Sequence, residues 1–479
     1  MASFLSPARI TAAGHDRWLV PPCALAVHLC IGMAYGFSVF WLPLGRALVG
    51  VPACTGLGEA LVSTSCNWRV SDLVWVYTLF FVVLGLAAAL WGGWVEGAGP
   101  RKAGLLAMVC WGGGLALAAL AVAQHWLWLL WLGAGVLGGI GLGLGYITPV
   151  STLIKWFPDR RGLATGMAIM GFGGGAMLGS PLADRLMHGF ETAGSVGAWQ
   201  ALLVLAGVYA VAMTAGALGF RLPAVVAGPA GGSWRVPLAE VHRTRQFWLV
   251  WLVLLLNVSA SIGIIGVASP MLQELFGPGL VGAPGVALAA LAPAQRDAAA
   301  AIGAGFVGLI SLFNIGGRFF WAGLSDRLGR RRTWALMLAL AALIYGLLLP
   351  GPGLGRLALF VAGFALIASA YGGGFATVPA WLADLFGTAE VGAIHGRLLT
   401  AWSTAGVLGP LAVAYARDAG LAAGLAPADI YARIFIGLAG LLLLGLLAAC
   451  AVRPVAAGLQ VAHAPAAAMA APPPATPRW

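Results

Sequence analysis

Long apolar stretches recur along the whole chain and define its predicted elements. A helix needs roughly 20 predominantly apolar residues to cross a bilayer, and twelve stretches of suitable length are present. Six lie in the first half, at 18–44, 72–95, 103–123, 126–151, 161–184 and 197–220, and six in the second, at 246–269, 299–322, 333–350, 357–380, 394–416 and 430–452. The pattern predicts an all-α membrane protein with twelve transmembrane helices in two pseudo-symmetric six-helix halves.

Composition supports a membrane location. The chain is 61% hydrophobic and 9% charged, and its mean hydropathy is +0.94. These values exclude an ordinary soluble domain. We expect the lipid bilayer to be its surroundings.

Basic residues indicate the orientation, because cytoplasmic loops are enriched in Lys and Arg. With the N-terminus inside, 18 of the 26 basic residues are cytoplasmic and 7 are on the opposite face. We expect an inner-membrane protein with both termini cytoplasmic. The net charge of +11 then reflects this bias and not a nucleic-acid partner. The predicted segments are a cytoplasmic start (1–17), a first half (18–220), a cytoplasmic linker (221–245), a second half (246–452) and a disordered tail (453–479).

One loop sequence occurs twice, displaced by 230 positions (326 − 96 = 230). Its first copy contains Gly93, Glu96, Gly99, Arg101 and Lys102, and its second contains Gly323, Asp326, Gly329, Arg331 and Arg332. Each copy follows one apolar stretch and precedes another, so each forms a tight loop between two spanning helices. The chain therefore contains two copies of one membrane half.

These paired loops resemble the signature of the major facilitator superfamily, whose members have two six-helix halves around a central site. The resemblance implies a transporter in which the loop acids and bases form ion pairs that help to hold the outward-open state. Glu96 would then pair with Arg101 and Lys102, and Asp326 would pair with Arg331 and Arg332. The alternative is that these charges only determine topology.

A narrower resemblance is to the oxalate/formate antiporter family. It rests on Gly145-Tyr-Ile-Thr-Pro149, on the run that starts at Lys155 and ends at Gly166, and on the glycine-rich run that starts at Gly171. The resemblance implies a small organic anion as substrate. The motifs specify the family better than they specify the substrate.

When charged residues near the span ends are counted with the loops, as above, Arg318 is the only basic residue left inside a span, and no acid is left there to neutralise it. A buried arginine in a membrane normally faces a cavity and has a partner. A carboxylate suits the planar guanidinium, which donates two parallel hydrogen bonds. Asn314 lies one helical turn away, and the resemblance implies that this pair binds the substrate carboxylate. The alternative is that Arg318 snorkels to the interface.

The sequence departs from oxalate-transporting relatives in the eleventh span. Those relatives carry a lysine after a Thr-Ala pair, whereas this chain has Trp402 followed by Ser403. A single fixed positive charge neutralises one carboxylate better than two, so a monocarboxylate is favoured over oxalate. Trp402 would narrow the cavity or offer an indole N–H to the ligand.

Other polar residues in the spans are candidate ligand contacts, although most could equally be packing residues. Tyr146 and Tyr371 rank first because glycine-rich backbone adjoins them, and Tyr35 and Asn257 follow. His28 is taken as the only histidine inside a span and hence the only obvious titratable carrier. Cys54 and Cys66 share one loop and could form a disulfide if it faces an oxidising compartment.

Alternating access of a central site is the mechanism that these features favour. The absence of membrane acids weakens proton symport, so exchange of anions is the simpler coupling, with a proton-linked symporter or a carrier of another metabolite as alternatives. The chain shows no metal-binding cluster, no nucleophile with a base and no nucleotide-hydrolysing motif. We expect a monomer with no enzymatic activity and no cofactor.

Overall fold

The computed structural model describes residues 11–12, 15–45, 47–48, 50–192, 194–223, 234–265, 268–348 and 354–462. The first half contains η1 (Arg17–Leu19), α2 (Val20–Ile31), η2 (Gly32–Phe40), α3 (Trp41–Leu44), α4 (Leu57–Val62), α5 (Val70–Ala98), α6 (Pro100–Gln124), α7 (Leu127–Leu130), η3 (Trp131–Gly138), α8 (Gly139–Trp156), α9 (Arg161–Phe190) and α10 (Ala198–Gly219). The second half contains α11 (Leu238–Val241), α12 (Arg245–Ile265), α13 (Ala268–Leu280), η4 (Leu288–Ala290), α14 (Pro293–Leu328), α15 (Arg330–Leu347), α16 (Leu354–Phe386), α17 (Val391–Leu398), α18 (Thr400–Ala422), α19 (Pro427–Ala451) and η5 (Ala457–Leu459).

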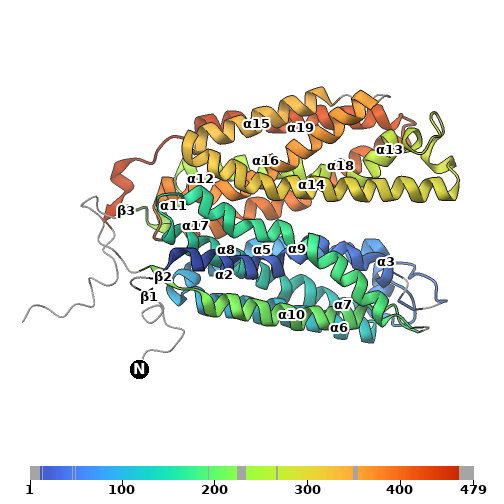
Figure 1. The fold of residues 1–479 in the computed structure, drawn as a ribbon, viewed down its shortest axis with the longest axis horizontal. Helices are drawn as coiled ribbons and strands as arrows, with labels where there is room; N and C mark the ends of the chain where they lie inside the picture. Colours follow the sequence, from blue (N-terminus) through green and yellow to red (C-terminus); the bar gives the residue numbers. More distant parts are fainter. Residues whose placement is uncertain are drawn as a thin grey trace, which may run out of the picture.

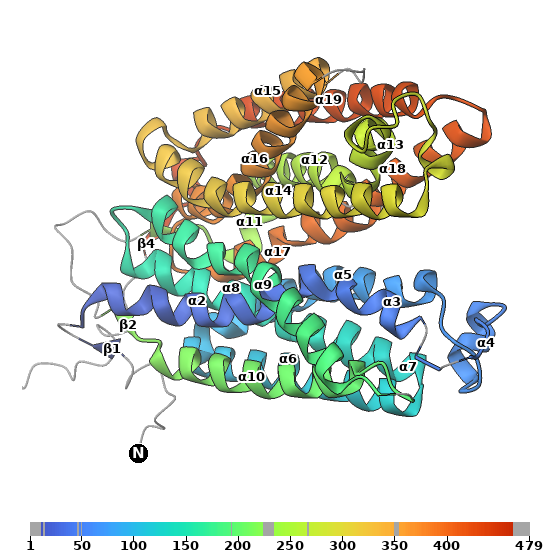
Figure 2. The same ribbon diagram turned by 45° about the vertical axis from the view of Figure 1, so that its right-hand side comes forward.

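The helices form two bundles that lie side by side with their axes along the long dimension of the molecule (Figure 1). Helices α2, α5, α6, α8, α9 and α10 belong to one bundle, and α12, α14, α15, α16, α18 and α19 belong to the other, as the rotated view also shows (Figure 2). The all-α fold with two six-helix halves is confirmed. Residues 224–233 of the predicted linker and 463–479 of the predicted tail lie outside the described residues.

Each predicted span coincides with a helix or a run of helices. Among the described residues, nine helical segments are long and apolar enough to cross a membrane by length and composition alone. Helix α15 falls short of that measure because three arginines open it. Large apolar side chains point outward along the bundles, as at Leu90, Val211 and Leu447, which are 74%, 74% and 68% exposed. Such a surface suits lipid and not water.

The first and eleventh spans are divided into shorter helical segments where the pattern predicted single helices. The first tightens into the 3₁₀ segment η2, where Gly32 and Gly36 allow a close approach to α9. A Cβ atom on Gly32 would lie 3.0 Å from the Cα of Gly175, and one on Gly36 would lie 3.3 Å from the Cα of Ala176. Small residues permit this close contact between membrane helices.

The two halves contact each other through helix pairs that the 230-residue repeat relates. A Cβ atom on Gly166 of α9 would lie 2.8 Å from the carbonyl oxygen of Arg318 on α14. A Cβ atom on Gly396 of α17 would collide with the carbonyl oxygen of Ala88 on α5. The repeat relates Gly396 to Gly166 (396 − 166 = 230) and Arg318 to Ala88 (318 − 88 = 230). The same close crossing therefore occurs twice.

The two ends of the bundles differ. At the end that carries the repeated loops, here called the motif end, two short strand pairs connect chain segments to the linker. Strand β1 (Thr11–Ala12) pairs in parallel with β2 (Leu222–Pro223), and β3 (Trp234–Arg235) pairs antiparallel with β4 (Val461–Ala462). At the opposite end, here called the disulfide end, Cys54 and Cys66 are bonded across the loop that contains α4. The disulfide considered from the sequence is therefore formed.

Candidate functional site

Arg318 is buried on α14, ten residues before that helix ends at Leu328 (328 − 318 = 10), with 1% of its surface exposed. Its Nη1 donates a hydrogen bond to the carbonyl oxygen of Ile169 on α9, at 2.9 Å, and so connects the two halves. Its Nε and Nη2 donate to Oδ1 of Asn314 at 3.3 and 3.2 Å. Because Asn314 precedes Arg318 on a helix that ends at the motif loop, the side chain extends away from that loop. Snorkelling toward the motif end would need the opposite direction.

Asn314 is oriented by a third helix. Its Nδ2 donates to the carbonyl oxygen of Ala368 on α16 at 3.1 Å, which turns Oδ1 toward the guanidinium. The partners given to Arg318 are thus an amide oxygen and a main-chain carbonyl, both uncharged. These partners satisfy only part of the hydrogen-bonding capacity of the guanidinium. Its positive charge has no counterion among the described contacts. This arrangement favours an anionic ligand.

Aromatic residues from both halves gather around Trp402 on α18. Its ring centroid lies 4.5 Å from that of Phe375, 5.4 Å from Phe81 and 5.7 Å from Phe172. Tyr146 and Tyr35 lie at 5.5 and 6.3 Å from the same ring. We call these six residues the Trp402 cluster.

Tyr371 joins this cluster through Tyr35, since their hydroxyl groups are 3.3 Å apart across the two halves. The structure therefore brings together four candidates from the sequence, namely Tyr35, Tyr146, Tyr371 and Trp402. Arg318 is close enough to act electrostatically on all three tyrosines. Charged and aromatic candidates thus occupy one region between the halves.

One hydroxyl of this cluster has no hydrogen-bond partner. The Tyr146 hydroxyl is buried and bonds to no other protein group, whereas the Trp402 indole N–H faces the Tyr371 hydroxyl. An unsatisfied buried polar group costs on the order of 1–3 kcal/mol, so each such group in a native fold needs an explanation. A bound substrate would supply the missing partner.

Ser403 and Asn257, also candidates from the sequence, have other surroundings. The Ser403 hydroxyl donates to the carbonyl oxygen of Phe81 and thereby connects α18 to α5. Asn257 is buried on α12, and its side chain lies by Gly374 of α16, next to the Trp334 ring of α15. These contacts describe helix packing within and between the halves, and they do not bring either side chain to the Trp402 indole.

His395 was missed as a candidate, and taking His28 as the only histidine inside a span was wrong. His395 lies on α17, is 1% exposed, and its ring centroid is 5.7 Å from that of Tyr146. His28 instead contacts main-chain carbonyl oxygens, Nδ1 that of Ala168 and Nε2 that of Tyr146. The signal was present in the sequence, since His395 falls within the apolar stretch 394–416.

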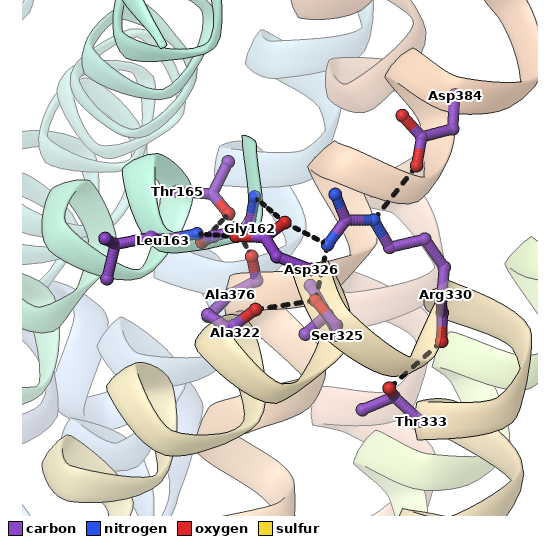
Figure 3. A network of polar contacts seen from close by, with 12 residues as sticks. Gly162, Leu163, Thr165, Ala322, Ser325, Asp326, Arg330, Thr333, Ala376 and Asp384 are labelled. Carbon is purple, nitrogen blue, oxygen red and sulfur yellow. Dashed lines mark hydrogen bonds and ion pairs between the residues drawn. The ribbon is translucent and has the colours of Figure 1, made fainter. Parts of the chain in front are cut away.

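The repeated loops hold the halves together at the motif end. Oε1 of Glu96 accepts a hydrogen bond from the Gly392 amide at 2.9 Å, at the start of α17 in the other half. Asp326 accepts hydrogen bonds from the Gly162 and Leu163 amides, both at 2.9 Å, at the start of α9 (Figure 3). Each acid therefore caps a helix of the opposite half, where the helix dipole favours a negative charge.

The ion pairs of these acids differ from the expected ones. Glu96 pairs with Lys155 and not with Arg101 or Lys102. Asp326 pairs with Arg330 at 2.6 Å, and Arg330 also contacts Asp384 at 3.0 Å (Figure 3), whereas Arg331 and Arg332 were the expected partners.

Backbone geometry accounts for this correction. Gly99 and Gly329 have φ angles of 84° and 85°, which glycine adopts readily, and the next helix starts directly after each. Arg101 and Arg331 then lie on that next helix and donate to the carbonyl oxygens of Phe220 and Val452, which follow the last helix of each half. Gly93 and Gly323 lie inside α5 and α14, where an added Cβ would meet open space.

Comparison with known proteins places these features in one family. The model of the Major Facilitator Superfamily matches residues 24–410. An MFS-type transporter of Escherichia coli, YhjX, is 25% identical over 79% of this chain and 83% of its own length. The oxalate:formate antiporter of Oxalobacter formigenes is 28% identical over 57% of this chain and 59% of its own length. Human monocarboxylate transporter 11 is 27% identical over 69% of this chain and 66% of its own length.

Solved structures share the fold. The fucose:proton symporter FucP of E. coli superposes with a TM-score of 0.62 at 14% identity and covers 91% of this chain and 98% of its own. The human organic anion transporter MFSD10 gives a TM-score of 0.62 at 17% identity, with 91% and 100% covered. The chain is a multi-pass membrane transporter and not an enzyme, and it belongs to the Major Facilitator Superfamily.

Proposed function

We propose that this transporter carries short organic anions, monocarboxylates in preference to oxalate, and that Arg318 binds the carboxylate. The observation that carries the proposal is the burial of Arg318 between the halves with only uncharged partners. A carboxylate would accept two parallel hydrogen bonds from the guanidinium and neutralise its charge. The names of the relatives, an oxalate:formate antiporter and monocarboxylate transporters, agree with an anionic substrate.

Asn314 would orient the guanidinium, and the Trp402 cluster would surround the rest of the substrate. Tyr35 and Tyr371 belong to opposite halves, and their hydroxyl contact would break when the halves tilt. Asn257 and Ser403 remain proposed contacts, although in this conformation their neighbours are other helices.

We infer that the structure represents a conformation closed at the motif end. The Glu96 and Asp326 contacts connect the halves there, and the Arg318 and Tyr35 contacts lie nearer the middle of the helices. The positive-inside bias favours a cytoplasmic position for the motif end, in an inner membrane. The disulfide would then lie on the oxidising side, and the site would next open outward.

Exchange is the coupling that the site favours. The residue one turn from Arg318 is the amide Asn314 and not an acid, so the pair carries one fixed positive charge. An empty site would have to move that charge between the two faces without a counterion, which is costly. A bound anion on each transit removes the cost, and an internal counter-anion should therefore accelerate uptake.

The first test is counterflow in proteoliposomes loaded with unlabelled anion. Labelled formate, lactate, pyruvate and oxalate would be offered to wild type, Arg318→Ala and Arg318→Lys. We expect saturable uptake of a monocarboxylate that Arg318→Ala abolishes and Arg318→Lys retains in part, since lysine keeps the charge but loses the planar fork.

Arg243→Ala is the matched control for the loss of an arginine. The Arg243 side chain is 78% exposed and pairs with Glu240 on the surface, where an ion pair contributes little. Transport that is unaffected by Arg318→Ala would remove Arg318 from the site and reopen the substrate class.

Proton-linked monocarboxylate symport is the second candidate. It is favoured by the two buried histidines, His28 and His395, whose rings both lie close to that of Tyr146. Uptake into vesicles that contain no anion, driven by an inward proton gradient alone, would support symport over exchange.

A further inference from the structure

Two neighbouring side chains leave three buried polar atoms without partners. These atoms are both ring nitrogens of His395 and the Tyr146 hydroxyl. The indole N–H of Trp402, beside them, faces the Tyr371 hydroxyl. His395, Tyr146 and Trp402 are 1%, 0% and 1% exposed, respectively. The Tyr146 ring centroid is 5.7 Å from that of His395 and 5.5 Å from that of Trp402. We call these three residues the His395 group.

The sequence spacing places His395 and Trp402 on one side of the eleventh span. They are seven residues apart (402 − 395 = 7), which is about two helical turns. Residues at this separation project from the same face of a helix. Tyr146 approaches that face from α8 in the other half, so the group lies where the two halves meet.

The internal repeat shows what a purely structural residue does at this position. The repeat relates His395 to Thr165 (395 − 165 = 230) and Ala376 to Tyr146 (376 − 146 = 230). The Thr165 hydroxyl donates to the carbonyl oxygens of Ala376 and Gly162 and thus connects α9 to α16 (Figure 3). His395 occupies the equivalent place beside Tyr146, yet neither of its nitrogens is bonded.

His28 provides a second comparison within the same region. Its ring is 5.5 Å from Tyr146, and both of its nitrogens contact main-chain carbonyl oxygens. A buried histidine that serves packing can therefore find partners in this part of the fold. The free nitrogens of His395 are better explained by a ligand that is bound during transport.

We propose that the His395 group is a specificity site that binds the uncharged oxygen of a short 2-hydroxy or 2-oxo monocarboxylate. The inference rests on the proposed function, in which Arg318 binds the carboxylate of the same molecule. Neutral histidine supplies one donor and one acceptor, tyrosine supplies a hydroxyl that does both, and the indole donates only. The group can therefore bond a hydroxyl or a keto oxygen.

The chemistry of the group discriminates against two other classes of anion. A second carboxylate would bring a second negative charge, and the group contains no fixed positive charge to neutralise it. An unsubstituted carboxylate such as propionate would leave the polar atoms unpaired in a dry site, and unpaired buried groups reject such analogues strongly. We therefore expect lactate and pyruvate to bind better than propionate and acetate.

The test compares lactate with propionate, which differ only by the 2-hydroxyl group. Each would compete with labelled lactate in proteoliposome counterflow, for wild type, His395→Phe and Tyr146→Phe. In wild type we expect lactate to compete about ten-fold better than propionate, the factor expected from one good hydrogen bond. In both variants the ratio should fall toward one, while competition by propionate stays near its wild-type value.

Tyr209→Phe is the matched control, because Tyr209 of α10 also carries a buried hydroxyl without a partner. It should leave the lactate-to-propionate ratio unchanged. If His395→Phe does not fold, His395→Gln keeps polar atoms at the position and should lower the ratio less than Tyr146→Phe does.

The two ways of failing are distinguishable. Wild-type protein that binds none of these anions would overturn the proposed function and this inference with it. Wild-type protein that binds them, with a lactate-to-propionate ratio unchanged in His395→Phe and Tyr146→Phe, would overturn this inference alone.

Discussion

The carboxylate of Glu96 in the first half accepts a hydrogen bond from the Gly392 amide in the second half at 2.9 Å. Under the 230-residue repeat, Glu96 corresponds to Asp326 and Gly392 corresponds to Gly162 (326 − 96 = 230 and 392 − 162 = 230). The equivalent contact is therefore the one between Asp326 and the Gly162 amide. That second contact is also 2.9 Å long. We call the two contacts the latches. Each places a negative charge on the positive end of a helix that belongs to the other half.

Removing the charge of a latch should open the motif end. Glu96→Gln and Asp326→Asn keep an oxygen acceptor but lose the favourable interaction with the helix dipole, worth about 1 kcal/mol. We expect each substitution to shift the equilibrium about five-fold toward the conformation open at this end. Spin labels at Arg160 and Leu328, both exposed at the motif end, would report the change in distance between the halves.

Asp159→Asn is the control for the latches. Asp159 is also at the motif end, but it pairs with Arg17 of its own half, and both side chains are partly exposed. The distance distribution should therefore match that of wild type. Identical distributions in Glu96→Gln, Asp326→Asn and Asp159→Asn would show that the latches do not hold the closed conformation.

The crossing of α9 and α14 should not tolerate a side chain at Gly166. A methyl group there would lie 2.8 Å from the carbonyl oxygen of Arg318, which is main chain and cannot rotate away. Overpacking of this kind costs about 1–3 kcal/mol. We expect Gly166→Ala to lower the melting temperature in detergent and to weaken anion binding, because the clash displaces Arg318.

Gly207→Ala is the matched substitution, since Gly207 lies in α10 and an added Cβ there would meet nothing within 4 Å. Alanine is the better helix former by about 1 kcal/mol, so this variant should melt at or above the wild-type temperature. Equal melting temperatures for the two variants would contradict the close crossing.

Trp402→Lys should move selectivity toward dicarboxylates. The indole is 1% exposed at the centre of the aromatic cluster, and an ammonium group there would add a second positive charge to the region that contains Arg318. We expect oxalate to gain about ten-fold over formate in competition, since coupling energies between close charge pairs of binding partners start at about 1.5 kcal/mol. Trp402→Phe separates the effect of the new charge from the loss of the indole. A lysine variant with the wild-type preference would argue that Trp402 does not face the substrate.

The repeat of 230 residues was enough to predict the two halves, the loops between spans and the similar roles of Glu96 and Asp326. It did not predict the partners of these acids. Gly162 and Gly392 contribute main-chain amides, which have no side-chain signature. Lys155 lies outside the repeated loop, and Arg330 has Pro100 as its counterpart in the first copy, so the comparison of the two loops pointed to neither base. The neighbouring bases Arg101 and Arg331 were expected to pair because they are close in sequence. The left-handed turns at Gly99 and Gly329 instead place both on the following helix.

The sequence predicted the members of the candidate site only in part, because most of its contacts depend on packing. A charge in an apolar stretch is conspicuous, so Arg318 and its neighbour Asn314 could be found from the pattern. The grouping of Tyr35, Tyr146, Tyr371 and Trp402 depends on packing between four different spans, and the sequence only ranked these residues singly. His395 was overlooked although it lies in the eleventh span, and only its missing hydrogen bonds distinguish it from His28.

A pH-dependent stability is expected at the disulfide end. The His125 ring stacks on Trp68 with centroids 4.1 Å apart, and its Nε2–H donates to the carbonyl oxygen of Cys66 at 2.8 Å. Burial lowers the pKa of His125 below its usual value near 6.5. The unfolded chain therefore binds more protons than the folded chain between these two pKa values, so stability falls as the pH drops through about 6.5 and levels off below the folded pKa.

Melting curves between pH 7.5 and pH 5 would measure this effect in wild type and in His125→Asn. Asparagine suits the position because His125 has a φ of 56°, a left-handed conformation that asparagine tolerates better than most residues, and its side chain does not titrate. The melting temperature of wild type should decrease more steeply with falling pH than that of the variant. Parallel curves would assign the pH dependence to other groups, and the stacked ring would then contribute packing but no titration.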